Sequence, residues 1–227
     1  MYNIREVFIK PGGSAAMEDY YPEYIDENVN IEINVKKPTE IGLVMLSSTG
    51  TKQNTVGYFT YPTDQKPTDI SQVTPIIAYP RISTAVCNSS STAGSMYTGD
   101  RVELKYWDGT KFVNEFPAGV SIAWFLIESS YNQSTKEVLN NKRTFYSIRD
   151  LNKSKEHRTI ALKNKSGEVV AFGMEDATNF EPTGDNTRKG NFGDAVFYLD
   201  FSDGSAIETG GVEELPDKSI NDKEIYN

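Results

Sequence analysis

Hydrophobic and polar residues alternate in several short segments of this chain. Residues 30–37, "NIEINVKK", and residues 99–109, "GDRVELKYWDG", both show the two-residue period. That period predicts β-strands with one buried face. Residues 118–130, "AGVSIAWFLIESS", are apolar at nearly every position and rich in β-branched and aromatic residues. A strand buried on both faces, and therefore central in a sheet, is the predicted structure there.

Turn signals connect further predicted strands. Residues 40–62 contain two apolar runs around a Ser/Thr/Gly segment, which predicts a hairpin. Residues 157–176 form a second predicted hairpin that turns at "NKSG". Residues 73–86 carry prolines, which favours an edge strand or a bent connection. Residues 194–204 are the last strongly apolar strand.

About ten strands result, at the spacing of roughly 8–12 residues that is typical of sandwiches and barrels. The sequence therefore predicts an all-β fold, a jelly-roll-like β-sandwich. Residues 30–205 form the expected domain. Residues 1–29 are expected to be a polar leader or linker, and residues 206–227 an acidic tail or interdomain linker.

Composition narrows the possible partners. The 227 residues carry a formal net charge of −9, so a nucleic-acid partner is not expected. No apolar run approaches the roughly 20 residues of a membrane span, and the start of the sequence has no signal-peptide pattern. The chain has one Cys and one His, which excludes a zinc site built from several such residues.

An acidic segment separates the last two predicted strands, in "GMEDATNFEPTGDNTRKGNFGDAVFYLDF". Calcium binds six to eight oxygen ligands, and this segment supplies oxygen donors from the side chains of Glu175, Asp176, Asp185, Asn191 and Asp194. If the two strands pair, Asp194 lies close to Glu175 and Asp176. Three alternatives remain open: a solvated loop whose acids are neutralised by Arg188 and Lys189, an Asp194 side chain that bonds backbone amides at the base of the loop, and a catalytic carboxylate pair as in glycosidases.

Two aromatic residues are candidates for ligand contacts. Trp107 is out of phase with the apolar positions of its strand, and Tyr131 follows the end of another strand. Exposed aromatic side chains at loop ends can stack against a ligand. The alternative for both is partial burial at a sheet edge.

Several phrases occur together in an order found in one bacterial family. They are "NTVGYFTYP" (54–62), "EFPAGVSIAWFLIESSY" (115–131), "FYSIRDLN" (145–152) and "VVAFGMEDA" with "GNFGDAVFYL" (169–199). In these motifs the chain resembles the domain of unknown function 4114 family, over roughly residues 40–200. The resemblance implies a β-sandwich module of exported or surface proteins, notably of Bacteroidetes and often beside an LruC-type domain. It implies calcium ligands at the acidic ends and no enzymatic activity.

The chain departs from the family pattern in the acidic loop. Asn191 stands where the family usually has Asp, and Gly193 where it usually has Asn. Both changes reduce the number of possible ligand atoms.

The expected function is that of a non-enzymatic module at the cell surface, secreted or periplasmic, in a longer chain whose signal sequence is not in this segment. It would bind Ca²⁺ in the 175–194 loop and a surface glycan or protein. A purely structural spacer without metal is the first alternative, and a carboxylate-dependent glycan hydrolase is the second.

Overall fold

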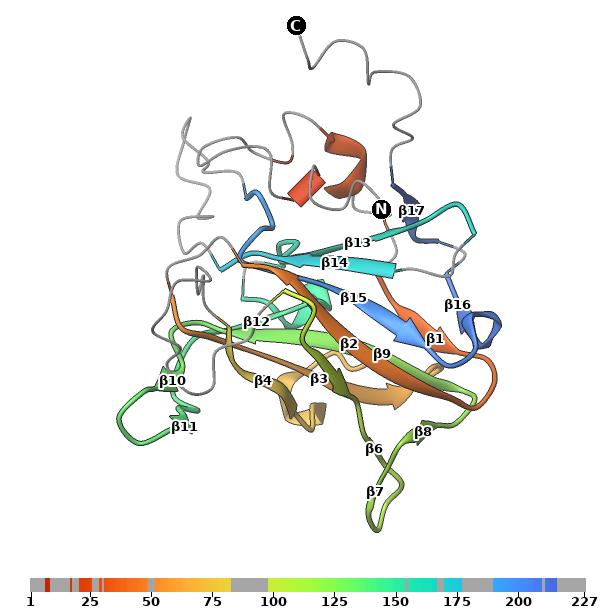
Figure 1. Cartoon of the computed structure of the whole chain (residues 1–227), viewed down its shortest axis with the longest axis horizontal. Helices are drawn as coiled ribbons and strands as arrows, with labels where there is room; N and C mark the ends of the chain where they lie inside the picture. The colour runs from red at the N-terminus through yellow and green to blue at the C-terminus, as the bar shows by residue number, and fades with distance from the viewer. Residues whose placement is uncertain are drawn as a thin grey trace, which may run out of the picture.

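Two β-sheets packed face to face make up the fold (Figure 1). The computed structural model describes residues 7–8, 17, 21–25, 29, 31–48, 52–82, 98–153, 155–166, 170–176, 190–209 and 211–215. The prediction of an all-β sandwich is confirmed. In this described part of the chain, no helix is long and apolar enough to cross a membrane.

The first sheet has six strands, in the order β16-β1-β9-β3-β4, and β12 also pairs with β9. Its strands are β1 (Ile33–Val35), β3 (Asn54–Pro62), β4 (Ile76–Ile82), β9 (Val120–Ile127), β12 (Thr144–Tyr146) and β16 (Ile207–Glu208). Strand β9 lies between β1 and β3, as its continuous apolar sequence predicts. Strand β4 lies at the edge, where the proline at position 80 removes no needed ladder hydrogen bond.

The second sheet has seven strands, in the order β17-β13-β14-β15-β2-β5, and β8 also pairs with β2. Its strands are β2 (Thr39–Ser47), β5 (Arg101–Glu103), β8 (Glu115–Phe116), β13 (Thr159–Lys163), β14 (Val170–Met174), β15 (Ala195–Phe201) and β17 (Glu213–Glu214). Among the described strand pairs, all are antiparallel except β13 with β17. The predicted hairpin over 157–176 is confirmed as β13–β14.

Two small hairpins and four 3₁₀ turns complete the described elements. The hairpins are β6 (Tyr106–Trp107) with β7 (Phe112–Val113), and β10 (Tyr131–Asn132) with β11 (Glu137–Val138). The turns are η1 (Pro22–Ile25), η2 (Ile70–Gln72), η3 (Arg149–Leu151) and η4 (Gly204–Ala206). The described strands number seventeen, more than the expected ten or so, because some expected strands are divided; the 99–109 segment, for example, contributes β5 and β6.

Aromatic side chains join the two sheets at the centre of the core. Trp124 of β9 lies 5.2 Å, between ring centroids, from both Phe172 of β14 and Phe197 of β15. Its neighbour Phe125 points to the other side of the sheet and packs in a second apolar cluster with Ile148. Strand β9 is therefore apolar on both faces because each face is covered.

The prediction of a hairpin over residues 40–62 is wrong. Strand β2 pairs with β15 and β5 in the second sheet, whereas β3 pairs with β9 and β4 in the first. The chain crosses from one sheet to the other between Ser47 and Asn54. A Ser/Thr/Gly segment suits a crossover as well as a turn, and its length here exceeds the 2–5 residues of most hairpin loops.

Described residues near the start of the chain cover the outer face of the second sheet. Val7, Phe8, Met17 and Tyr24 are buried in one apolar cluster with residues of β13, β14 and β15. After residue 205, β16 and β17 pair with the first and second sheets. A few apolar side chains among polar neighbours are thus enough to cover part of a sheet face. The division at residues 29 and 205 stays a prediction.

Gly173 of β14 is a point of close approach between this cover and the sheet. A Cβ atom at Gly173 would lie 2.3 Å from Cε1 of Phe8 and 2.5 Å from the backbone oxygen of Phe192. The oxygen cannot move without shifting the backbone. We therefore expect Gly173→Ala to lower the free energy of unfolding by about 1–3 kcal/mol, measured by urea denaturation. An unchanged midpoint would contradict the docking of Phe8 on β14.

Candidate functional site

The paired ends of β14 and β15 bring three carboxylates together. Met174 pairs with Ala195 in the ladder, so Glu175 and Asp176 leave β14 where Asp194 enters β15. One oxygen from each of Glu175, Asp176 and Asp194 lies within 4.8 Å of the others. The expected proximity of these three side chains is confirmed. Asp185, the other expected acidic ligand, lies outside the described residues.

Backbone amides hold this carboxylate cluster (Glu175, Asp176 and Asp194) in place. The amide of Asp176 donates to Oδ2 of Asp194 at 2.8 Å. Oε2 of Glu175 accepts from the amides of Asn191 at 2.9 Å and Phe192 at 3.2 Å. The amide of Asp194 donates to the carbonyl of Met174 at 3.1 Å, which continues the strand ladder into the site.

Asn191 contributes its backbone amide, which donates a hydrogen bond to Glu175 of the carboxylate cluster. Its side-chain oxygen accepts from the amide of Gly193 at 2.9 Å, which forms a local turn in which Phe192 has a φ of +53°. This turn directs the amides of Asn191 and Phe192 at Glu175. The expectation that the Asn191 side chain is a metal ligand stays a prediction, and its oxygen already accepts this hydrogen bond.

A lysine that the sequence analysis missed, Lys52, binds the cluster from the crossover that leads into β3. Lys52 Nζ lies 2.9 Å from Oδ1 of Asp176 and 2.6 Å from Oε1 of Glu128, at the end of β9. Asn54, the first residue of β3, donates to Oδ2 of Asp176 at 2.6 Å and accepts from the amide of Ser129 at 3.0 Å. The only sequence signal for Lys52 was a single basic residue in a polar connection, and the crossover that places it could not be read from the pattern.

Among the residues that the structure describes, negative charge exceeds positive charge at this end of the sandwich. The carboxylates of the cluster and of Glu128 form one network in which Lys52 supplies the one described ammonium group. Partial burial lowers the pKa of Lys52, but its hydrogen bonds to Glu128 and Asp176 outweigh this, so its pKa lies above the usual value. The ammonium therefore stays charged.

This excess of negative charge affects the pKa of Asp194. Burial, followed by the negative charges of Glu175 and Asp176, raises the pKa of Asp194 from 3.8 to about 9. Its side chain shares a hydrogen bond with Glu175, which requires a proton on one of the two carboxyl groups. Without a cation, this proton compensates part of the repulsion.

The geometry of the cluster fits a calcium ion. Calcium–oxygen distances of 2.3–2.6 Å put ligands on opposite sides of one ion roughly 4.6–5.2 Å apart. The oxygens of Glu175, Asp176 and Asp194 lie within 4.8 Å of one another and are close enough to contact one ion, and further oxygens would have to complete its six to eight ligands. A bound cation would take the place of the proton shared by Asp194 and Glu175, and its charge would relieve their repulsion.

The two candidate aromatic residues lie on separate hairpins. Trp107 of β6 is 45% exposed and makes an edge contact with Phe112 of β7, which is 55% exposed, at 5.1 Å between ring centroids. Tyr131 of β10 is half-buried, and the guanidinium of Arg81 lies 5.7 Å from its ring centroid. The β6–β7 and β10–β11 hairpins project at different corners of the sandwich (Figure 1). Trp107 and Tyr131 therefore belong to different surfaces.

Comparison with known protein families gives a match in the second half of the chain. Residues 116–202 match the model of the family described as domain of unknown function, DUF4114. Over these residues the chain resembles that family. Neither the curated proteins nor the solved structures include a match to this chain.

The DUF4114-like segment (residues 116–202) contains all three carboxylates of the cluster, together with β9, β14 and β15. The "NTVGYFTYP" phrase at residues 54–62 lies before it, although it forms β3. Lys52 and Asn54, which bind Asp176, also lie before it. The cluster is thus built inside the DUF4114-like segment and is neutralised in part from outside it.

Proposed function

We propose that the chain is a non-enzymatic β-sandwich module that binds Ca²⁺ at Glu175, Asp176 and Asp194. The observation that supports this most is that, within the described part of the chain, the carboxylates where the ends of β14 and β15 meet outnumber the ammonium group of Lys52. A divalent cation supplies the missing positive charge and accepts the oxygen donors that are present. The backbone amides on Glu175 and Asp194 orient those donors.

The proposed role of the ion is to tie together the two ends of the 175–194 loop. Both ends are already held by hydrogen bonds from Asp176, Asn191 and Phe192. A cation between Glu175 and Asp194 would hold the loop ends more firmly than a shared proton, because it interacts with several carboxylates at once. Extracellular calcium modules function with dissociation constants of about 10⁻⁴–10⁻³ M.

We place the module at the cell surface, or in a secreted or periplasmic protein, within a longer chain. Its proposed task is adhesion or the binding of a glycan or protein. The half-exposed Trp107–Phe112 pair supports this, because aromatic side chains of this kind serve as contact surfaces. The resemblance of the sequence motifs to those of surface proteins also supports this proposed task.

The alternative is a spacer domain without bound metal. Lys52 and Asn54 satisfy both oxygens of Asp176, and two amides satisfy one oxygen of Glu175. In this alternative, the cluster is a structural network completed by a proton on Asp194 or Glu175.

Thermal unfolding distinguishes the calcium-binding module from the metal-free spacer. With EGTA removed and Ca²⁺ added to about a hundredfold excess over its dissociation constant, we expect stabilisation by about 2.7 kcal/mol. For a chain of this size, that corresponds to a rise in Tm of about 5–10 °C. Mg²⁺ at the same concentration serves as the control and should have a smaller effect, because it requires a tighter octahedral shell. A Tm that does not respond to Ca²⁺ at concentrations far above the dissociation constants of extracellular calcium modules supports the spacer.

A further inference from the structure

One buried arginine of the first sheet has two donor atoms without a hydrogen-bond partner among the residues that the structure describes. Arg81 of β4 is 6% exposed, and the described residues offer no acceptor to its enclosed Nε and Nη1 atoms. A guanidinium stays charged in proteins, and burying a charge without a partner is strongly unfavourable. A bound anion would remove this cost, so Arg81 is a candidate for anion recognition.

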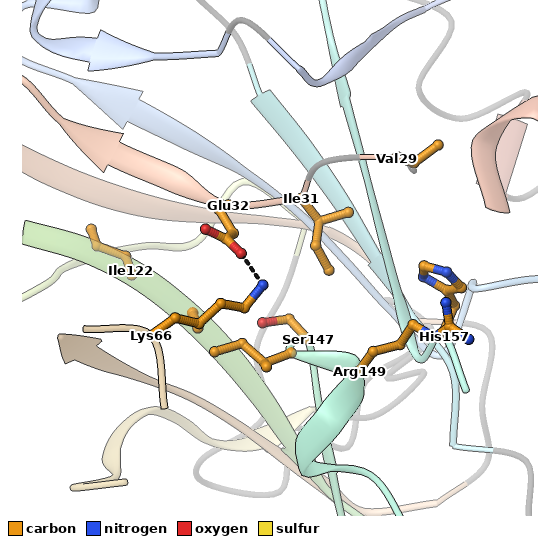
Figure 2. A pocket seen from close by; sticks show the side chains of 10 residues that line it. Val29, Ile31, Glu32, Lys66, Ile122, Ser147, Arg149 and His157 are labelled. Carbon is orange, nitrogen blue, oxygen red and sulfur yellow. Dashed lines mark hydrogen bonds and ion pairs between the residues drawn. The ribbon is translucent and has the colours of Figure 1, made fainter. Parts of the chain in front are cut away.

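The charged groups around a described cavity of the same sheet differ from Arg81 in this respect. The cavity, of about 220 Å³, lies beside β9 and the segment that leads into β1. Figure 2 shows Glu32 and Lys66 of its lining in an ion pair. The Nε atom of Arg149, in the same lining, donates to the carbonyl of Lys155 at 2.6 Å. These groups bond within the chain, so the cavity gives no comparable reason to expect an ionic ligand.

A β-bulge in strand β4 sets the position of Arg81. Asn54 of β3 pairs with Ile82, whereas Val56 pairs with Tyr79. Two steps along β3 thus correspond to three steps along β4, and Arg81 lies within the longer stretch. Bulges are frequent at sheet edges and beside functional sites, where they redirect a side chain. The direction of Arg81 is therefore a built feature of the edge strand.

The ring of Tyr131 lies against the guanidinium. The Cζ atom of Arg81 is 5.7 Å from the ring centroid, which is within the range of a cation–π contact. Tyr131 is half-buried on β10, and its amide donates to the carbonyl of Gln53 at 3.2 Å. A ring face orients a guanidinium, but it accepts none of the paired, charge-assisted hydrogen bonds that a carboxylate accepts. Tyr131, a candidate ligand contact from the sequence, thus borders a charge that it does not neutralise.

Strand β4 also offers an edge to which a peptide can pair. In the described part of the chain, β4 pairs only with β3. Backbone groups on the other side of an edge strand can hydrogen-bond an extended peptide, as in β-strand addition. Ile77 of β4 is 43% exposed and lies four residues from Arg81, about 13 Å along an extended strand. A peptide of about five residues spans both side chains.

We propose that the outer edge of β4 binds an extended acidic segment of a protein partner. A glutamate or aspartate of that segment pairs with Arg81 beside Tyr131, and an apolar residue of the segment covers Ile77. Charge complementarity selects this partner, because Arg81 is the one charged residue of β4 and the described residues leave its Nε and Nη1 atoms unbonded. The inference rests on the proposed function in taking the chain to be a protein-binding module, and it does not require the calcium ion.

The test is an NMR titration of the full chain with two synthetic peptides. Both have seven residues of alternating Thr and Val, with Glu at the centre of one and Gln at the centre of the other. The Glu peptide should shift the Nε–H signal of Arg81 and should bind at least about tenfold more tightly than the Gln peptide, because a charge-assisted pair is roughly twice as strong as a neutral hydrogen bond. Equal affinity for the two peptides, or no binding of the Glu peptide, overturns the proposal.

Glucuronate is the third probe, because an acidic sugar carries the same carboxylate without a peptide backbone. It should bind at least about tenfold more weakly than the Glu peptide, since it cannot pair with the edge of β4. If glucuronate shifts the Arg81 signal at a lower concentration than the Glu peptide does, the occupant is a sugar and the proposal is wrong.

Matched arginine variants locate the contact. Arg81→Met should abolish the preference for the Glu peptide, and without peptide it should leave Tm unchanged or raise it, because it removes an unpaired buried charge. Arg81→Lys keeps the charge but not the planar fork of donors, so it should retain only part of the preference. Arg101→Met is the control, because Arg101 lies on β5 of the second sheet and pairs with Glu103 and Asp200. It should keep the full preference.

Two results with these variants would contradict the site. One is an unchanged preference for the Glu peptide in both Arg81→Met and Arg81→Lys. The other is a marked fall in Tm for Arg81→Met without peptide, which would mean that the guanidinium is already neutralised within the fold.

Running each titration in EGTA and in Ca²⁺ separates this proposal from the proposed calcium site. A preference for the Glu peptide in EGTA, with a Tm that does not respond to Ca²⁺, supports the peptide site and contradicts the calcium site. A Tm that rises with Ca²⁺, together with equal binding of the two peptides, contradicts the peptide site and supports the calcium site.

Discussion

In EGTA at about pH 8, the Asp194→Asn variant is expected to be more stable than the unaltered chain, by about 3–5 kcal/mol. Asparagine can keep the hydrogen bond from the amide of Asp176 and can donate its own N–H to Glu175. It thus imitates the protonated form of Asp194 without needing a proton. With saturating Ca²⁺ the order should reverse or narrow, because the variant has lost a charged ligand.

The pH dependence follows from the direction of the pKa shift. The folded-state pKa of Asp194 is raised from 3.8 to about 9, so the folded chain holds a proton that the unfolded chain has released. Stability in EGTA is therefore greatest below about pH 4 for this group and falls as pH rises towards 9, by up to about 1.4 kcal/mol per pH unit. The Asp194→Asn variant should lack this slope.

Asp64→Asn is the matched control, because Asp64 is exposed in the loop after β3. It should leave both the Tm in EGTA and the response to Ca²⁺ unchanged. Urea denaturation at several pH values, with and without Ca²⁺, measures the whole set. If Asp194→Asn instead destabilises the chain in EGTA, then Asp194 is charged in the fold and acts by accepting backbone hydrogen bonds.

The two tryptophans are expected to differ sharply when each is replaced by alanine. Trp124 is fully buried between Phe172 and Phe197, so Trp124→Ala should lower the free energy of unfolding by about 3–5 kcal/mol. Trp107 loses only a surface contact with Phe112, so Trp107→Ala should change stability by about 0.5 kcal/mol or less.

Chemical denaturation of both variants under one set of conditions measures this difference. Because Trp107→Ala should leave stability unchanged, this variant can also be used in an assay for loss of the proposed adhesion. Similar destabilisation by both changes would mean that the β6–β7 hairpin packs on the sandwich more closely than its exposure indicates.

The sequence pattern predicted the strands whose partners are close in the chain or whose burial is unambiguous. β13 and β14 form the expected hairpin, and the continuous apolar run of β9 indicated its central place. The same reasoning failed for β2 and β3, because alternation reports which face is buried and not which sheet a strand joins. Val7, Phe8 and Met17 were missed because single apolar residues in a polar segment carry no periodic signal.

Part of the candidate site could also be predicted from the sequence, namely its three acidic residues. Glu175, Asp176 and Asp194 flank consecutive strands, so pairing of those strands was enough to bring them together. Lys52 and Asn54 reach Asp176 from the other sheet. Their arrival depends on how the two sheets are stacked, which a linear pattern does not contain.

The net charge of the chain has a kinetic consequence for the proposed calcium site. A chain of net charge −9 attracts cations from a distance, so long-range forces speed the approach of Ca²⁺ to the carboxylate cluster. Added salt screens this attraction beyond about 10 Å at 0.1 M ionic strength. The association rate constant of Ca²⁺ should therefore fall as the ionic strength rises.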